Sequence, residues 1–89
     1  MEKQKKKKQV KKKYDKETTF HLKQLGKRLQ ELRIKKGYTN YEIFAYDHDI
    51  GRAQYGSYES GRNIQFDTLL KLIKLHKISI KDFFSEGFD

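Results

Sequence analysis

The apolar residues beyond Thr18 recur at intervals of three and four, the spacing that places side chains on one face of a helix. The first such stripe consists of the leucines Leu22, Leu25, Leu29 and Leu32. Thr18 or Thr19 can cap its start, and Gly37 can adopt the left-handed conformation that ends many helices. The pattern therefore predicts a first helix that begins after one of these threonines and ends near Gly37.

Two shorter helices are predicted on either side of a tight turn. The first of them covers residues 40–47, and Thr39 or Asn40 can accept the free amide hydrogens at its start. One side of it carries Tyr41, Phe44, Ala45 and His48. Only residues 49–51 separate it from the next helical segment, residues 52–60. The two helices are thus expected to meet at an angle across a three-residue turn.

Two more helices complete the pattern. The stripe of the fourth is Phe66, Leu69, Leu70 and Ile73. It follows the loop 62–65 and ends near His76. Ser79 and Asp82 resemble a capping box, which predicts a short fifth helix carrying Phe83 and Phe84. The expected fold is all-α, with five helices in one compact domain.

Two short helices joined by a three-residue turn fit the helix-turn-helix arrangement. Several segments match one family in order and spacing: residues 25–33 with Gly37, Ala45, residues 58–62, residues 69–72 and residues 79–84. On these residues the chain resembles the lambda-repressor-like or Cro-like family, also called the xenobiotic response element family. The resemblance implies a compact five-helix DNA-binding domain.

Four positions depart from the family pattern. The distance from Gly37 to Ala45 is one residue longer than usual, so the start of the second helix is expected to shift. Asp49 stands where glycine is common, and aspartate tolerates a positive φ better than most residues. Gly51 replaces the usual Ser or Thr cap, and Lys77 replaces a glycine.

Charge is concentrated at the N-terminus. The 89 residues include 21 Lys and Arg against 12 Asp and Glu, a net charge of +9. Residues 1–16 contain nine lysines and two acidic residues, which accounts for +7 of this total. With so little apolar content, residues 1–17 are expected to form a lysine-rich flexible arm, disordered or frayed, and residues 18–89 the helix-turn-helix domain. The balance favours polyanionic partners, nucleic acid first.

The arm has three interpretations. It can bind DNA phosphates without reading sequence, serve as a localisation signal, or act only as a solubilising tail. No apolar stretch suited to a signal peptide or a membrane span accompanies the lysines. The expected location is therefore cytoplasmic, and the family resemblance implies a bacterial or phage-type protein associated with the nucleoid.

The third helix carries the candidate base-reading residues. If residues 52–60 form a helix, Tyr55 and Tyr58 face the core with Ile50, and the opposite face meets DNA. The candidates on or near that face are Arg52, Ala53, Gln54, Gly56 and Ser57. Arg52 can fork onto guanine O6 and N7, although a solvated surface arginine is the alternative. Gly56 either permits close approach to DNA or is simply tolerated.

Phosphate contacts are expected near helix starts and the residues around them. The candidates are Asn40, Tyr41, Arg62 and Asn63, and the core is an alternative place for Tyr41. The family resemblance implies that Arg33 and Glu59 form an ion pair that ties the first helix to the third. That role is structural.

The function expected is a sequence-specific transcriptional regulator, most simply a repressor, that acts as a homodimer on double-stranded DNA. Phe83, Phe84 and Phe88 are the candidate dimer interface, unless Phe83 or Phe84 closes the monomer core. The rival function is a protein-interaction module, such as an antitoxin or a recruiter in a larger complex. RNA binding or sequence-indifferent binding is a third interpretation.

Catalysis, metal binding and a cofactor are not expected. The chain has no cysteine, and its three histidines are each more than twenty residues from the next. No serine has a nearby histidine base, and the glycines do not form a loop that would cradle a phosphate.

Overall fold

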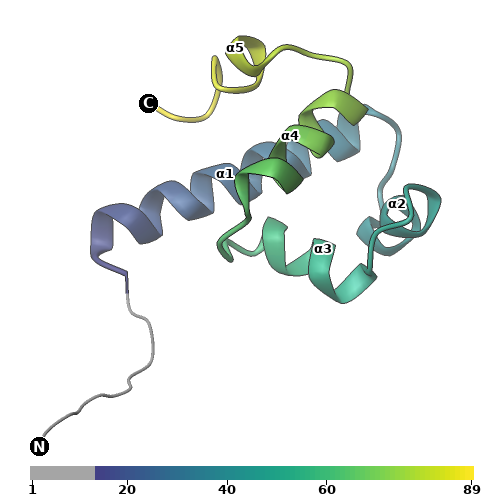
Figure 1. Cartoon of the computed structure of the whole chain (residues 1–89), viewed down its shortest axis with the longest axis horizontal. Coiled ribbons are helices and arrows are strands. Elements are labelled where there is room, and N and C mark those ends of the chain that lie inside the picture. Colours follow the sequence, from purple (N-terminus) through teal and green to yellow (C-terminus); the bar gives the residue numbers. More distant parts are fainter. Residues whose placement is uncertain (1–13) are drawn as a thin grey trace, which may run out of the picture.

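The computed structural model describes residues 14–89, which form five α-helices and no strand (Figure 1). The helices are α1 (Lys16–Lys35), α2 (Tyr41–Asp47), α3 (Arg52–Glu59), α4 (Phe66–Leu75) and α5 (Ile80–Phe83). In Figure 1, α1 spans the molecule, and α3 and α5 lie on opposite sides of it. The all-α prediction with five helices is confirmed.

The first helix begins earlier than the sequence pattern predicted. Asp15 is the N-cap, and its side chain accepts a hydrogen bond from the backbone N of Thr18 at 2.8 Å. The prediction of Thr18 or Thr19 as the cap is therefore wrong, because an aspartate three residues upstream supplies the acceptor. Lys16 and Glu17, assigned to the arm from sequence, lie inside α1. Residues 1–13 of the predicted arm lie outside the described residues.

The predicted end of α1 is confirmed. Gly37 has φ +106°, and the backbone N of Tyr38 donates to the carbonyl of Arg33 at 3.1 Å. This left-handed residue with its backward hydrogen bond is the usual way in which a helix ends at glycine. It turns the chain from α1 into α2.

Every helix contributes to one core. Its fully buried large side chains are Leu29 from α1, Phe44 from α2, Tyr55 from α3, Leu72 from α4 and Phe83 from α5. Burial of a side chain of this size stabilises a fold by about 1.5–3 kcal/mol. Because the core draws on all five helices, the orientation of α3 depends on the whole domain.

The face that α4 buries differs from the predicted stripe. Leu69 and Ile73 are buried as expected, but Leu72 takes the place assigned to Leu70, which is only half-buried. Leu70 lies about 100° from Leu69 around the helix axis, at the edge of the buried face. Phe66 is exposed, because it is the first residue of α4 and precedes the turns that cover the core.

A buried arginine on α1 fixes the C-terminal helix. Ser79 caps α5 as predicted, accepting from the backbone N of Asp82 at 3.0 Å. At the other end, Arg28 donates from Nε to the carbonyl of Phe83 at 2.7 Å and from Nη2 to that of Asp82 at 2.9 Å. These bonds satisfy carbonyls that a helix end leaves free. The sequence analysis did not identify this role of Arg28.

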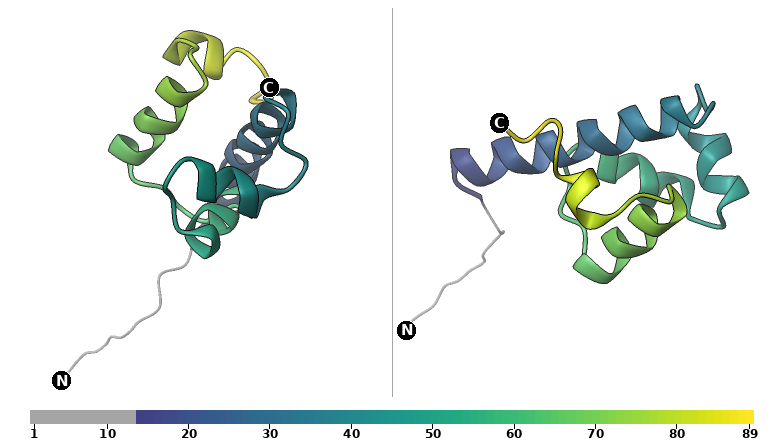
Figure 2. Two further views of the ribbon diagram at one scale, coloured as in Figure 1. Left: turned by 90° about the vertical axis from the view of Figure 1, so that its right-hand side faces the viewer. Right: turned by 90° about the horizontal axis from the view of Figure 1, so that it is seen from above.

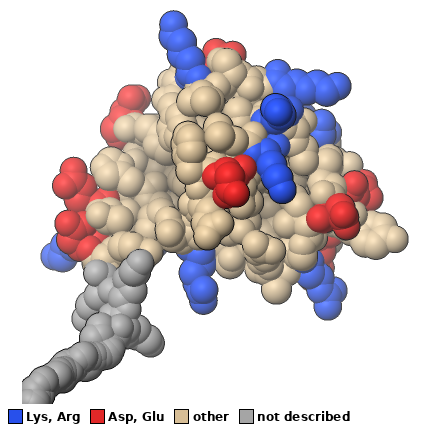
Figure 3. Space-filling model, viewed as in Figure 1, with Lys and Arg blue, Asp and Glu red and all other residues tan. Residues whose placement is uncertain are grey.

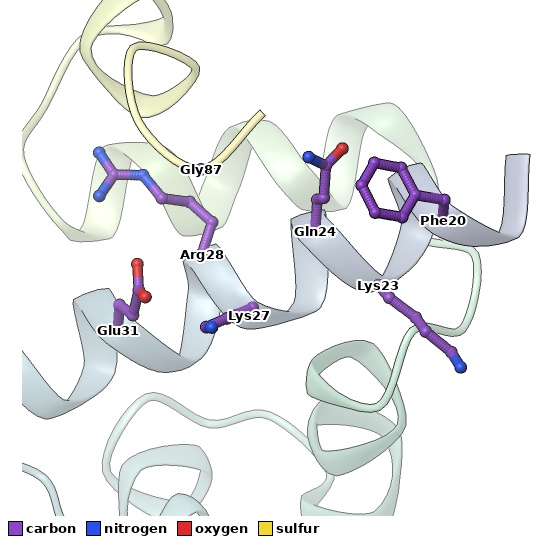
Figure 4. Close-up of a pocket in the computed structure, with 7 residues that line it drawn as sticks. All are labelled: Phe20, Lys23, Gln24, Lys27, Arg28, Glu31 and Gly87. Carbon is purple, nitrogen blue, oxygen red and sulfur yellow. The ribbon is translucent and has the colours of Figure 1, made fainter. Parts of the chain in front are cut away.

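The C-terminal segment returns along α1, as the views in Figure 2 show. Gln24 Nε2 donates to the carbonyl of Asp89 at 3.4 Å, and Gly87 lines a shallow cleft over the same stretch of α1 (Figure 4). Phe88 packs against the core, and its ring centroid lies 4.9 Å from that of Phe84. This end of the chain therefore covers α1 on the side away from α3.

Candidate nucleic-acid interface

The turn between α2 and α3 has the geometry that the sequence predicted. Asp49 has φ +58°, the left-handed conformation expected of the residue that stands in place of glycine. The backbone N of Ile50 then donates to the carbonyl of Ala45 at 2.8 Å. Gly51 precedes α3 without a side-chain cap. The two helices thus meet across four residues, the C-cap His48 and the predicted turn residues 49–51.

Asn40 sets the start of α2. Its Oδ1 accepts from the backbone N of Glu42 at 2.7 Å and from that of Ile43 at 3.2 Å. The cap at Asn40 was one of the two predicted. Because Oδ1 is engaged, Nδ2 is the group of this side chain that remains to donate to a phosphate.

The back of α3 lies directly on α1. A Cβ atom at Gly26 would lie 2.5 Å from the carbonyl oxygen of Glu59 and 2.7 Å from that of Tyr58. Only glycine permits backbones to approach this closely. Tyr55 and Tyr58 fill the core beneath α3, as predicted.

A buried ion pair locks the same contact. Arg33 donates from Nε to Glu59 Oε2 at 2.8 Å and from Nη2 to Oε1 at 3.0 Å, and the two side chains are 5% and 8% exposed. Arg33 Nη1 also donates to the carbonyl of Tyr38 at 2.8 Å. The hydrogen bond to Glu59 raises the pKa of Arg33 above its usual value. The pairing expected from the family resemblance is present.

The opposite face of α3 is open. Arg52, Ala53 and Gln54 are exposed, whereas Gly56 and Ser57 are half-buried. Two of these side chains bond within the helix: Gln54 Nε2 donates to the Tyr58 hydroxyl at 2.7 Å, and Ser57 Oγ donates to the carbonyl of Gln54 at 2.6 Å. Arg52 therefore has the most extended polar side chain at the free end of α3.

Gly56 has a role that the sequence did not reveal. A Cβ atom there would lie 2.7 Å from Cε1 of Tyr41 and 3.2 Å from its hydroxyl oxygen. The tyrosine ring is 38% exposed and rests on α3 at this glycine. The glycine thus makes room for Tyr41, which lies between the two places predicted for it, partly covered and partly open to solvent.

The loop after α3 holds Arg62 and Asn63, both exposed. A Cβ atom at the preceding Gly61 would lie 3.1 Å from Cγ of Lys23, so this lysine of α1 adjoins the loop. Figure 4 shows Lys23 projecting away from Arg28, which faces the C-terminal segment. Sequence reasoning did not find Lys23, although its position three residues before Gly26 places both on the α1 face that meets α3.

The helix-turn-helix segment itself is not basic. Residues 38–63 contain four carboxylates, Glu42, Asp47, Asp49 and Glu59, and two arginines, Arg52 and Arg62. Arg52 Nη1 lies 3.7 Å from Glu42 Oε2, and the Tyr38 hydroxyl donates to Asp47 at 2.8 Å. Figure 3 shows basic and acidic side chains interspersed over the face seen in Figure 1.

Comparison with known sequences decides the family. The helix-turn-helix family model matches residues 29–83, from the buried half of α1 to the end of α5. The chain belongs to this helix-turn-helix family. The match agrees with the lambda-repressor-like resemblance and makes the chain a DNA-binding helix-turn-helix domain. No curated protein and no solved structure matches the chain.

Two of the three histidines of this helix-turn-helix domain, His48 and His76, take part in its packing. His76 stacks on Phe44 with ring centroids 5.6 Å apart, and its burial, with nearby Lys36, His48 and Arg28, lowers its pKa to about 4. His48 Nδ1 is bonded to the carbonyl of Phe44 at 2.8 Å. Within residues 14–89, no three histidine or carboxylate side chains are grouped to hold a metal. None of the helices in that range is long and apolar enough to cross a bilayer.

Proposed function

We propose that the protein is a sequence-specific transcriptional regulator, most simply a repressor, that places the N-terminal half of α3 in the DNA major groove. The observation that carries this proposal is the rigid mounting of α3. Its inner face is held by the Gly26 contact and the Arg33–Glu59 pair, while Arg52 and Ala53 are exposed. A fixed helix with a free N-terminal half is what base reading requires.

The residues on the open face of α3 have different proposed roles. Arg52 can donate two hydrogen bonds to guanine O6 and N7, and Ala53 suits the thymine methyl group. Gln54 and Ser57 are secondary base-reading candidates, because their polar groups already bond within α3. Gly56 contributes by seating Tyr41 at the edge of the same surface.

Phosphate contacts flank this helix in the proposed complex. Asn40 Nδ2 and the Tyr41 hydroxyl lie on the α2 side, and Arg62 and Asn63 lie beyond the other end of α3. The lysines of residues 1–16 would add sequence-independent attraction, because each phosphate that they neutralise releases counterions. We expect a location with the cell's DNA, cytoplasmic and associated with a bacterial or phage-type nucleoid.

A homodimer is part of the proposal. One recognition helix reads too few base pairs for selectivity in a genome, and two half-sites about 34 Å apart overcome this. Phe83 is fully buried and closes the monomer core, which is one of the two places predicted for it. Phe84, which is 41% exposed, and the half-buried Phe88 remain as the proposed interface.

A second candidate function is a protein-interaction module, such as an antitoxin or a recruiter. It is favoured by the outer side of α2, where Ile43 is 54% and Tyr46 84% exposed beside the carboxylate of Glu42. Exposed apolar side chains with an acidic neighbour suit a protein surface better than a phosphate backbone.

Selection of random duplexes by the full chain at near-physiological salt tests the proposal. The expected result is an enriched palindromic consensus with a G·C pair at the place of Arg52. A scrambled duplex of the same composition is the control for the enriched one. Equal binding of the two would contradict sequence-specific regulation and favour the protein-interaction module.

A further inference from the structure

We propose that Glu42 is a specificity-determining residue. Its carboxylate positions the guanidinium of Arg52 for contacts with bases and disfavours contacts of that guanidinium with phosphates. The inference rests on the proposed function, since it concerns how α3 reads DNA. Glu42 was not among the residues that the sequence singled out.

The two residues meet where the helix-turn-helix brings two helix starts together. Glu42 is the second residue of α2, and its backbone is fixed by the Asn40 cap. Arg52 is the first residue of α3. Glu42 Oε2 lies 3.7 Å from Arg52 Nη1, and the side chains are 47% and 75% exposed. Both also line a hollow with Ile43 and Tyr46.

The pair is poorly suited to a structural role. An exposed ion pair contributes about 0–1 kcal/mol to stability. The Arg33–Glu59 pair in the same domain has two short hydrogen bonds and side chains that are 5% and 8% exposed. The Glu42–Arg52 pair has neither the short hydrogen bonds nor the burial of the Arg33–Glu59 pair. Its effect should therefore be on what the surface binds and not on the stability of the fold.

If Arg52 only bound phosphate, the carboxylate of Glu42 beside it would be unfavourable, because a carboxylate repels the DNA backbone. It does not prevent base reading. A guanidinium has five N–H donors, and Glu42 lies at one nitrogen, Nη1, while Nε and Nη2 can still face guanine. On non-cognate DNA, Arg52 stays with Glu42 and adds little affinity. On a cognate site, Arg52 keeps Glu42 and gains a bidentate contact.

The test is a double-mutant cycle with Glu42→Gln, Arg52→Ala and the combined variant. Affinities are measured for the enriched duplex and the scrambled duplex over a range of salt concentrations. Asp82→Asn on α5 is the control, because it removes the same charge on the side of the molecule away from α3. Thermal melting of each variant checks that the fold is intact.

We expect Glu42→Gln to raise affinity for the scrambled duplex by about 3- to 10-fold and to lower the ratio of enriched to scrambled binding by a similar factor. The salt slope on the scrambled duplex should steepen by about 0.9, the value for one additional neutralised phosphate. With Ala at position 52, Glu42→Gln should leave the ratio unchanged.

Two results would overturn the inference: an equal change on both duplexes, as expected for Asp82→Asn, or the same fall in the ratio when position 52 is Ala. Either would show that Glu42 acts through general charge or through the start of α2. Equal affinity of the unsubstituted protein for the enriched and scrambled duplexes would have a different meaning. It would contradict the proposed function, on which this inference rests.

Discussion

The N-terminal segment and the helix-turn-helix segment differ most in how they use charge. Residues 1–16 contain nine lysines and two acidic residues, whereas residues 38–63 contain two arginines and four carboxylates. In the helix-turn-helix segment three of these charged groups have a specific ionic partner: Glu59 pairs with Arg33 of α1, and Arg52 lies beside Glu42. The N-terminal segment differs from the helix-turn-helix segment in composition, with lysine at nine of its 16 positions.

This difference suggests a division of work. Many cations in one short segment raise affinity for any polyanion, and the gain falls as salt is added. A few groups held at fixed positions discriminate between bases but add little general affinity. We propose that the N-terminal segment supplies attraction and the α2–α3 unit supplies selectivity.

The largest effect is expected from Arg33→Ala, which destabilises the fold and leaves the lysines in place. The substitution strands Glu59 as a buried charge, so the free energy of unfolding should fall by about 3–5 kcal/mol. Denaturant titration measures this loss. Sequence preference should be retained wherever the variant is folded, and unchanged stability with lost preference would contradict the structural role.

Acid should weaken the folded domain next. The pKa of His76 is about 4 in the fold, below its ordinary value of 6.5, because the buried ring resists protonation. Between these values the unfolded chain binds the proton and the native domain does not, so stability falls as the pH falls from 6.5 to 4. The loss at pH 4.5 should be about 2–3 kcal/mol.

His76→Phe is the matched variant, because it keeps a ring against Phe44 and removes the titrating group. Its unfolding free energy should change less between pH 7 and pH 4.5, by the same 2–3 kcal/mol. Identical pH dependence in the two proteins would refute the assignment. Selective binding needs the folded domain, so acid should weaken it before it weakens the general attraction of DNA to the N-terminal lysines.

Deletion of residues 2–13 tests the other half of the comparison. Affinity for every duplex should fall by about 10- to 100-fold at low salt, and the salt slope should become shallower by about 0.9 for each phosphate that the protein no longer neutralises. Fluorescence anisotropy against salt concentration measures both quantities. An unaltered slope would leave the segment only a solubilising role.

The smallest effect is expected from Gly56→Ala, which touches only the α2–α3 unit. Alanine favours the helix by about 1 kcal/mol over glycine, but its Cβ must displace the Tyr41 ring. We expect these effects to offset each other, with a net change within about 1 kcal/mol. When position 41 is Ala, the same change should stabilise by about 1 kcal/mol in thermal melts. Equal effects in both backgrounds would refute the contact.

Much of the fold could be predicted because its signals are local. Apolar stripes predicted the first and fourth helices, and the capping pattern of Ser79 and Asp82 predicted the fifth. Asn40 and Ser79 were recognisable caps, and Asp49 takes the positive φ that its position required. The Thr18 or Thr19 cap failed because Asp15 offers an equally local acceptor slightly earlier. The stripe of α4 failed because only packing against other helices decides between Leu70 and Leu72.

The candidate site was less predictable because its contacts join distant residues. Arg33 and Glu59 came from family resemblance, and no spacing rule connects residues 26 positions apart. The contact between Gly56 and Tyr41 depends on how α2 crosses α3. The link between Glu42 and Arg52, and that between Arg28 and the end of α5, likewise require the three-dimensional arrangement.

The most direct test of the proposed division is the specificity ratio of the chain that lacks residues 2–13. Binding to the enriched and scrambled duplexes is compared in parallel with the full chain, at salt concentrations where both proteins bind measurably. If the α2–α3 unit carries selectivity, the two affinities fall together and their ratio stays within about threefold of the full chain's, roughly 0.6 kcal/mol. A ratio that collapses toward one with the deletion would contradict this account, because selectivity would then depend on the lysine-rich segment.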